Sequence, residues 1–307
     1  MLNIPPFLSF VTLYETYLRR CFTNAGLLLQ TLKLDDETTI QFWGPNPGET
    51  ARKPPVMLIH GFGPVGIWQW RKQVQCLTPH FDVYVPDLIF FGGSTTTCAE
   101  RTEVFQAASV AKLADKLNLD RFHVVGTSYG GFVAYHVAQM RPERVGKVVI
   151  ASSGANMRKG DNEQLLGRAK LEKIEDLMLP ETAANLRTLM DLAVYKRVAH
   201  VVPDFVLNEF INRLYSENRK EKIDLLKGLT LGREDDPGIY ALQQEVLLIW
   251  GDHDQLFPLR MATELKELLG KKVKLEVMKN TAHVPQIEDP LRFNSILKDF
   301  LCDDESS

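Results

Sequence analysis

The chain has 307 residues, of which 45% are hydrophobic and 24% charged, and its 36 Lys and Arg residues are nearly balanced by 39 Asp and Glu residues. This composition is typical of a globular protein with a sizeable core, and a formal net charge of -3 provides no basic surface for nucleic acid. The four cysteines are scattered without a C-x-x-C pair, so we expect neither a zinc site nor a disulfide framework but reduced thiols in a cytoplasmic protein.

The N-terminal segment, residues 1–28, is predicted to form an amphipathic helix. No basic region precedes its apolar run, so the sequence does not indicate a secretory signal. Such an apolar stripe usually packs on a core, which is what we expect here. Peripheral contact with a membrane surface is the alternative that the sequence leaves open. The stripe, whose members recur at helical spacing, consists of Phe7, Val11, Tyr14, Leu18, Cys21 and Phe22.

Eight segments have the residue pattern of β-strands. The acidic turn at residues 35–37 makes the first two an antiparallel pair. From the third segment onward, apolar runs alternate with helical patterns, which is typical of central strands in a parallel sheet. The sequence therefore predicts an α/β fold with a mostly parallel eight-stranded sheet flanked by helices. The segments cover residues 29–34, 38–43, 56–59, 81–85, 122–125, 145–151, 246–250 and 273–278.

The alternation stops between residues 156 and 240, where the pattern is helical and no strand run occurs. We expect this segment to be a helical lid inserted after the sixth strand. Most of its apolar residues should pack the lid helices together, and a few should face a pocket beneath them. The predicted organisation is an N-terminal helix (1–28), a core (29–155 and 241–301), the lid (156–240) and a disordered tail (302–307).

The segment Gly126-Thr127-Ser128-Tyr129-Gly130 has the pattern G-x-S-x-G between a strand and a helical run. The turn required there is so tight that the serine must adopt strained backbone angles, and larger residues at positions 126 and 130 would collide. It places the serine hydroxyl at the N-terminus of a helix, where the dipole favours negative charge. Ser128 is therefore the predicted nucleophile, and a chance Gly-Ser-Gly turn is the weaker alternative.

A serine hydroxyl is a weak nucleophile and needs an adjacent base. Of the seven histidines, His283 is the candidate, because it follows the last strand and precedes a helix, in a loop at the carboxyl edge of the sheet. The base in turn needs a carboxylate that fixes its tautomer. The loop after the seventh strand offers two candidates for this acid, Asp252 and Asp254.

Hydrolysis by such a serine also requires two backbone N–H groups aimed at the developing oxyanion. The segment His60-Gly61-Phe62-Gly63-Pro64 ends the third strand near the predicted serine turn. Phe62 in this loop and Tyr129 directly after the nucleophile are placed to supply these donors. His60 is expected to serve the loop architecture rather than catalysis.

With these motifs, the chain resembles the α/β-hydrolase superfamily over residues 29–301. Residues 85–94 also look like the D-x-x-G-x-G-x-S loop of that family, although Phe90 stands where the first glycine is usual. Ala282 likewise replaces the glycine usual before the histidine. The resemblance implies the α/β-hydrolase fold, Asp254 as the acid through the G-x-x-D loop, and an acyl-enzyme mechanism that needs no metal or organic cofactor.

The substrate class is less well specified, because the motifs resemble several branches of the family. The loop after the third strand, with Trp68 and Trp70, looks like the meta-cleavage-product hydrolases, which cut carbon–carbon bonds in dienoates. Residues 282–290 look more like monoacylglycerol-lipase-type members and general esterases, and the combination is similar to a group of plant α/β-hydrolases. A non-catalytic ligand receptor on the same fold is a further alternative, which the intact Ser, Asp and His set disfavours.

One comparison favours the serine esterase or lipase-like branch. The lid arginine that grips the dienoate in the carbon–carbon hydrolases falls on Phe210, although Arg213 lies on the same helical face and could substitute. Thr127 and Val284 also replace residues usual in that branch. We therefore expect a small-molecule ester or lipid substrate, with Phe210 and Trp68 in its binding pocket. The oligomeric state is left open.

Overall fold

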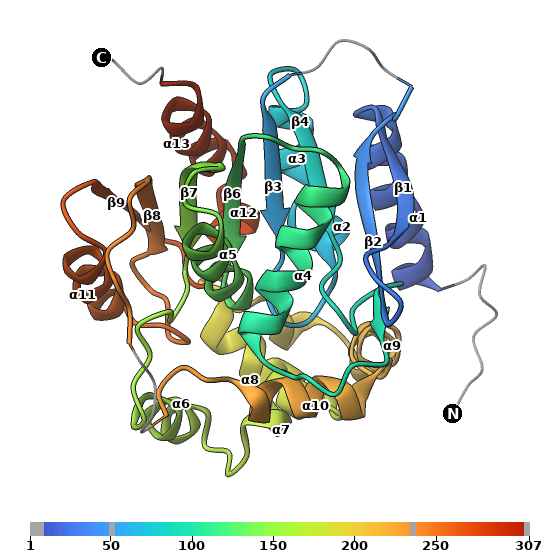
Figure 1. Cartoon of the computed structure of the whole chain (residues 1–307). Helices are drawn as coiled ribbons and strands as arrows, with labels where there is room; N and C mark the ends of the chain where they lie inside the picture. The colour runs from blue at the N-terminus through green and yellow to red at the C-terminus, as the bar shows by residue number, and fades with distance from the viewer. Residues whose placement is uncertain (1–8, 49–52, 234–237, 304–307) are drawn as a thin grey trace.

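The computed structural model describes residues 9–48, 53–233 and 238–303 and has one large sheet with helices on both faces (Figure 1). The strand order is β1-β2-β4-β3-β6-β7-β8-β9, and the short β5 pairs with β2. The predicted mostly parallel α/β sheet is confirmed: pairing is antiparallel at β1 and β2 and parallel from β4 to β9. The strands are β1 (Leu27–Lys33), β2 (Thr38–Pro45), β3 (Pro55–Ile59), β4 (Asp82–Pro86), β5 (Thr95–Thr96), β6 (Phe122–Thr127), β7 (Val145–Ala151), β8 (Glu245–Gly251) and β9 (Val273–Met278).

Two hydrophobic clusters fill the space between the sheet and its helices. Alternate residues of a strand point to opposite faces, so Met57 and Ile59 of β3 belong to one cluster and Val56 and Leu58 to the other. This explains why the central strands are apolar at every position. One face is covered by α4 (Glu103–Lys116), α5 (Tyr129–Met140) and α11 (Leu259–Leu269), and the other by α1 (Phe10–Asn24), α3 (Arg71–Leu77) and α13 (Pro290–Cys302).

A run of helices separates β7 from β8 and lies together beyond one end of the sheet (Figure 1). Its residues form two small hydrophobic clusters, one around Leu186 and Ile211 and one around Leu165 and Leu177. Most apolar side chains of this insertion thus pack its own helices together. The elements are α6 (Asp161–Ala169), α7 (Ile174–Met178), α8 (Ala183–Ala193), the 3-10 helix η2 (Val198–Val201), α9 (Asp204–Leu214) and α10 (Arg219–Gly228).

Helix α1 begins directly after Ser9, whose hydroxyl accepts a hydrogen bond from the backbone N–H of Thr12. Val11, Leu18, Cys21 and Phe22 of the predicted stripe are buried. The prediction was wrong for Tyr14, which remains 44% exposed and whose ring lies tilted at 53° to that of Trp68, with the centroids 5.3 Å apart. Phe7 lies outside the described residues.

Helix α13 extends to Cys302, one residue into the predicted tail, and residues 304–307 lie outside the described part of the chain. Within the described residues, none of the helices has the length and apolarity that crossing a bilayer requires.

Asp87 is an unusual acid because it follows β4 in the interior of the protein. It is 3% exposed, and its Oδ1 atom has no hydrogen-bond partner among the described residues. Gly92 lies against the other oxygen, since a Cβ at that position would be 2.3 Å from Asp87 Oδ2. Burial raises the pKa of Asp87 from its ordinary value of 3.8 to about 7.

We expect Asp87 to make the protein less stable as the pH rises from about 4 to about 7. In that window the unfolded chain loses the proton while the folded chain keeps it, so ionisation favours unfolding. Above about pH 7, Asp87 is ionised in both the folded and the unfolded chain, and it no longer changes the stability with pH. Asp87→Asn should remove this part of the pH dependence when denaturant unfolding is measured from pH 4 to 8. The exposed Asp120→Asn is the control, and an unchanged slope in Asp87→Asn would refute the prediction.

Candidate active site

The backbone at Ser128 is strained in the manner that the G-x-S-x-G pattern predicts. Ser128 lies between β6 and α5 with φ 54° and ψ -123°, a region that residues with side chains rarely adopt. A Cβ at Gly126 would lie 2.0 Å from the carbonyl oxygen of Gly130, and one at Gly130 would lie 2.3 Å from that of Ile59. Glycine is therefore required at both positions. The turn places Ser128 at the carboxyl edge of the sheet and the N-terminus of α5.

His283 and Asp254 lie in the loops after β9 and β8 and form a buried pair. His283 Nδ1 is 3.0 Å from Asp254 Oδ2, and the Asp254 side chain is fully buried. The other oxygen, Oδ1, accepts hydrogen bonds of 2.9 Å from the backbone N–H groups of Leu256 and Phe257. Because an ionised carboxylate can only accept, Nδ1 must carry a proton, which leaves Nε2 of His283 as an acceptor.

Asp252, the competing acid, is engaged elsewhere. Its Oδ1 lies 2.6 Å from Nδ1 of the half-exposed His253, and Lys279 Nζ is 3.6 Å from Oδ2. These neighbours hold the pKa of Asp252 below its ordinary value, although desolvation opposes them. The structure thus brings Asp254, and not Asp252, to His283.

The loop after β3 is held by one glutamine. Gln69 Oε1 accepts from the backbone N–H of Gly61 at 2.8 Å, and its Nε2 donates to the carbonyl oxygens of Gly61 and Pro64. This fixes the backbone around Phe62, whose ring packs edge to face on Tyr129 with the centroids 5.7 Å apart. Within the described residues, the N–H of Phe62, which lies in the loop, donates to no backbone carbonyl, and that of Tyr129 donates to none outside α5.

His60 supports the same loop from inside the core. Its Nε2 accepts from the backbone N–H of Leu88 at 3.0 Å, so its Nδ1 is the donor to the carbonyl oxygen of Gly61. Complete burial lowers the pKa of His60 from 6.5 to about 4, which keeps the ring neutral at ordinary pH. It therefore joins the loops after β3 and β4, the architectural role that the sequence predicts.

An apolar cavity of about 330 Å³ opens beside Ser128 and His283. Trp68 and Phe210, the two predicted pocket residues, both border it, and their ring centroids are 5.5 Å apart. His283 is the sole titratable group besides two tyrosine hydroxyls among the described residues that line it. A smaller apolar space of about 50 Å³ also borders Ser128. The other residues that line the 330 Å³ cavity are mainly aliphatic or aromatic and include Met178, Leu186, Leu189, Met190, Tyr215 and Ile287.

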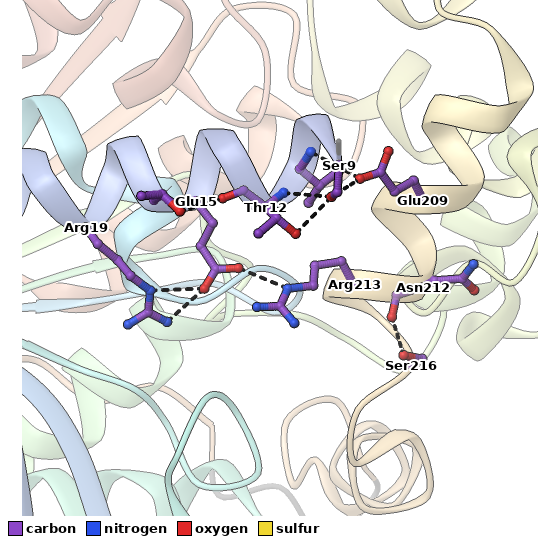
Figure 2. Close-up of polar contacts among 10 residues, drawn as sticks. Ser9, Thr12, Glu15, Arg19, Glu209, Asn212, Arg213 and Ser216 are labelled. Atoms are coloured by element: carbon purple, nitrogen blue, oxygen red, sulfur yellow. Dashed lines mark hydrogen bonds and ion pairs between the residues drawn. The ribbon is translucent and has the colours of Figure 1, made fainter. Parts of the chain in front are cut away.

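Arg213 does not border this cavity, although it lies one helical turn from Phe210. Its Nε donates to Glu15 Oε2 at 3.1 Å, and Glu15 also contacts Arg19 (Figure 2). Arg213 is therefore turned toward α1. Within the described residues, no group of three His, Cys, Asp or Glu side chains is placed to hold a metal ion.

Glu288 is a residue of this site that the sequence analysis did not single out. Its two oxygens accept from the backbone N–H groups of Ala282 and Tyr195, both at 2.7 Å, and the N–H of His283 donates to the carbonyl of Ala193 at 3.0 Å. Burial raises the pKa of Glu288. The histidine loop is thereby attached to the end of α8. The sequence showed only that an acidic residue follows His283 by five positions. It gave no sign of the contact with Tyr195, because that residue is distant in sequence.

Residues 54–290 match the family model of the alpha/beta hydrolase fold. The chain belongs to this α/β-hydrolase family. The hydrolase is 28% identical to the 2-hydroxymuconate semialdehyde hydrolase of Pseudomonas sp. (strain CF600) over 259 residues, which cover 82% of this chain and 88% of that protein. It is 24% identical to the monoacylglycerol lipase ABHD6 of Homo sapiens over 309 residues, covering 95% and 87%.

The hydrolase also resembles a solved structure that is described as a membrane phospholipase A and a novel bacterial virulence factor. The TM-score is 0.77 at 23% identity, and the match covers 95% of this chain and 91% of that one. At this level of identity the likeness establishes the common fold alone. The match of residues 54–290 to the family model confirms the family predicted from the sequence motifs.

Proposed function

We propose that this α/β-hydrolase cleaves carboxylic esters of apolar small molecules or lipids through Ser128, His283 and Asp254. The observation that carries the proposal is a serine on a strained turn that shares an uncharged apolar cavity with a histidine paired to a buried carboxylate. The serine would attack the ester, the histidine would move the proton, the carboxylate would orient the histidine, and the cavity would bind the apolar chain. A pure binding protein would gain nothing from the strain at Ser128.

In the proposed reaction, His283 Nε2 takes the proton of the Ser128 hydroxyl while the oxygen attacks the ester carbonyl. The backbone N–H groups of Phe62 and Tyr129 bind the resulting oxyanion. His283 then gives the proton to the departing alkoxide, which leaves as the alcohol. Water, deprotonated by His283, attacks the acyl-enzyme, and His283 returns this proton to the Ser128 oxygen as the acid leaves. Asp254 stabilises the imidazolium in both halves of the reaction.

The character of the cavity favours an ester over a dienoate. The 2-hydroxymuconate semialdehyde hydrolase, at 28% identity, makes carbon–carbon hydrolysis the second candidate. A dienoate carries a carboxylate, whose burial is costly unless a cation accompanies it. No Arg or Lys borders the cavity among the described residues, and Arg213 is paired with Glu15. A neutral ester with an apolar chain requires no such partner.

Replacing the nucleophile provides the first test. Ser128→Ala should lower ester turnover by more than about 10⁴-fold, because loss of the nucleophile disables the whole catalytic set. A fluorophosphonate should label the wild-type protein and not this variant. Thermal unfolding should show that the variant remains folded. Persistent labelling would mean that Ser128 is not the nucleophile.

The two aspartates of the β8 loop form a matched pair. Asp254→Asn should lower kcat by about 10⁴-fold, since the amide no longer holds the histidine in the required tautomer. Asp252→Asn alters an acid two residues away that contacts His253 instead, and it should retain most activity. Steady-state kinetics on one soluble ester compares them. If Asp252→Asn proved the more damaging substitution, the proposed acid would be wrong.

Substrate class can be tested with the wild-type protein and two variants at one position. We expect measurable kcat/KM on medium-chain esters and monoacylglycerols and negligible turnover of 2-hydroxy-6-oxo-dienoates. Phe210→Arg should reduce medium-chain ester kcat/KM by about tenfold or more, because it places a cation against the apolar chain. Phe210→Leu, which keeps the pocket apolar, should be milder. Wild-type turnover of dienoates that rivals ester turnover would favour carbon–carbon hydrolysis.

A further inference from the structure

Helix α1 carries an exposed apolar stripe in addition to its buried face. Phe10, Leu13, Tyr14 and Tyr17 are 66%, 54%, 44% and 47% exposed. Their spacing of three, four and seven residues places them on one side of the helix. We call these four residues the outer stripe. Isolated exposed apolar side chains are ordinary, but a continuous row of large ones marks a contact surface.

The outer stripe is carried on a helix that is fixed to two parts of the protein. Leu18 and Phe22 are buried against the sheet. On the opposite flank, Glu15 accepts from Arg19 at 2.8 Å and from Arg213 of α9 at 3.1 Å (Figure 2). The backbone N–H of Val11 donates to Glu209 of α9 at 3.3 Å. The stripe therefore keeps a constant orientation relative to the insertion.

These contacts also determine the charge that surrounds the stripe. Glu15 is the one acidic residue of α1, and it is turned inward, where two arginines pair with it. Arg20 remains exposed on the helix. At the other edge, Arg71 Nη1 donates to the hydroxyl of Tyr17 at 2.7 Å, and Lys72 next to it is exposed. Three basic side chains thus border the stripe, and the acid near its N-terminal end, Glu209 of α9, is turned toward Ser9 and the backbone of Val11.

The stripe continues into the mouth of the apolar cavity. Tyr14 belongs to both, since it lines the cavity and its ring centroid is 5.3 Å from that of Trp68. Ile287 of α12 (Pro285–Glu288) also lines the cavity and is 49% exposed. An apolar chain leaving the cavity would therefore meet further apolar side chains before it met water.

We propose that the outer stripe of α1 docks the protein on a lipid surface with anionic headgroups, so that the substrate chain passes from the lipid directly into the cavity. Partial insertion of Phe10, Leu13 and Tyr17 would bury apolar area, while Arg20, Arg71 and Lys72 would face the headgroups. The delivery step depends on the proposed esterase function, but the docking does not. A second copy of the chain fits less well, because four side chains provide far less than the roughly 800 Å² per partner of a standard interface.

The test separates docking from catalysis. Ser128→Ala protein is floated with vesicles of phosphatidylcholine, either alone or mixed with phosphatidylserine, so that hydrolysis cannot alter the lipid. We expect binding to the mixed vesicles. Adding Phe10→Ser and Leu13→Ser should reduce that binding by about tenfold or more. Adding Leu268→Ser should not reduce it, since this leucine, also exposed (45%), lies on α11 at the other edge of the sheet. Arg20→Glu should weaken binding to the mixed vesicles only.

Activity measurements then show whether the docking proposal or the esterase proposal is wrong. In the catalytic protein, the Phe10→Ser/Leu13→Ser variant should hydrolyse a soluble short-chain ester normally and monoacylglycerol in vesicles more slowly. If the wild-type protein hydrolysed neither the soluble ester nor the monoacylglycerol, the proposed esterase function would be wrong. The docking proposal would still be judged by the flotation experiment. Absence of wild-type binding, or equal binding by the stripe variant and wild type, would overturn docking. So would self-association in sedimentation that the stripe variant abolishes, which would identify a second copy as the partner.

Discussion

The close approach of backbone at the end of β6 is the constraint on which the site depends. Gly126, Gly130 and the carbonyl of Ile59 are in contact at distances that leave no space for a Cβ, so β3, β6 and α5 must meet at one point. That contact forces Ser128 into its positive φ and turns it out of the sheet. The buried apolar strands on both sides supply the free energy that maintains such strain. The position of Ser128 is therefore a property of the whole sheet.

The parallel sheet brings the other parts of the site to the same edge, because loops after successive parallel strands emerge on one side. The insertion completes the arrangement through hydrogen bonds to backbone groups: Ala193 and Tyr195 hold the loop of His283 directly and through Glu288. The insertion thus orients His283 and also lines the cavity. Its connection to α1 through Arg213 and Glu15 joins the surface helix to the same unit.

The sequence predicts those features that depend on local pattern. Apolar runs located all eight principal strands, and G-x-S-x-G located the strained turn, because each is specified by neighbouring residues. Features that depend on contacts between residues far apart in the sequence could not be predicted from it. Glu288 accepts from the backbone N–H of Tyr195, which lies 93 residues earlier in the chain, and Tyr14 contacts Trp68, which is equally remote from any local pattern. The two-residue β5 has too few residues for any periodicity to appear.

Arg213 shows how one such contact alters the functional interpretation. From the sequence it lies on the same helical face as Phe210 and could have supplied a cation for a carboxylate substrate. In the folded chain Glu15 is buried and needs a cationic partner, since an unpaired carboxylate there would be costly. Arg213 therefore pairs with α1, and the cavity remains apolar. The helix that keeps this cation away from the cavity also carries Tyr14 at the cavity mouth, so one element governs both the polarity of the site and the surface through which an apolar substrate would enter.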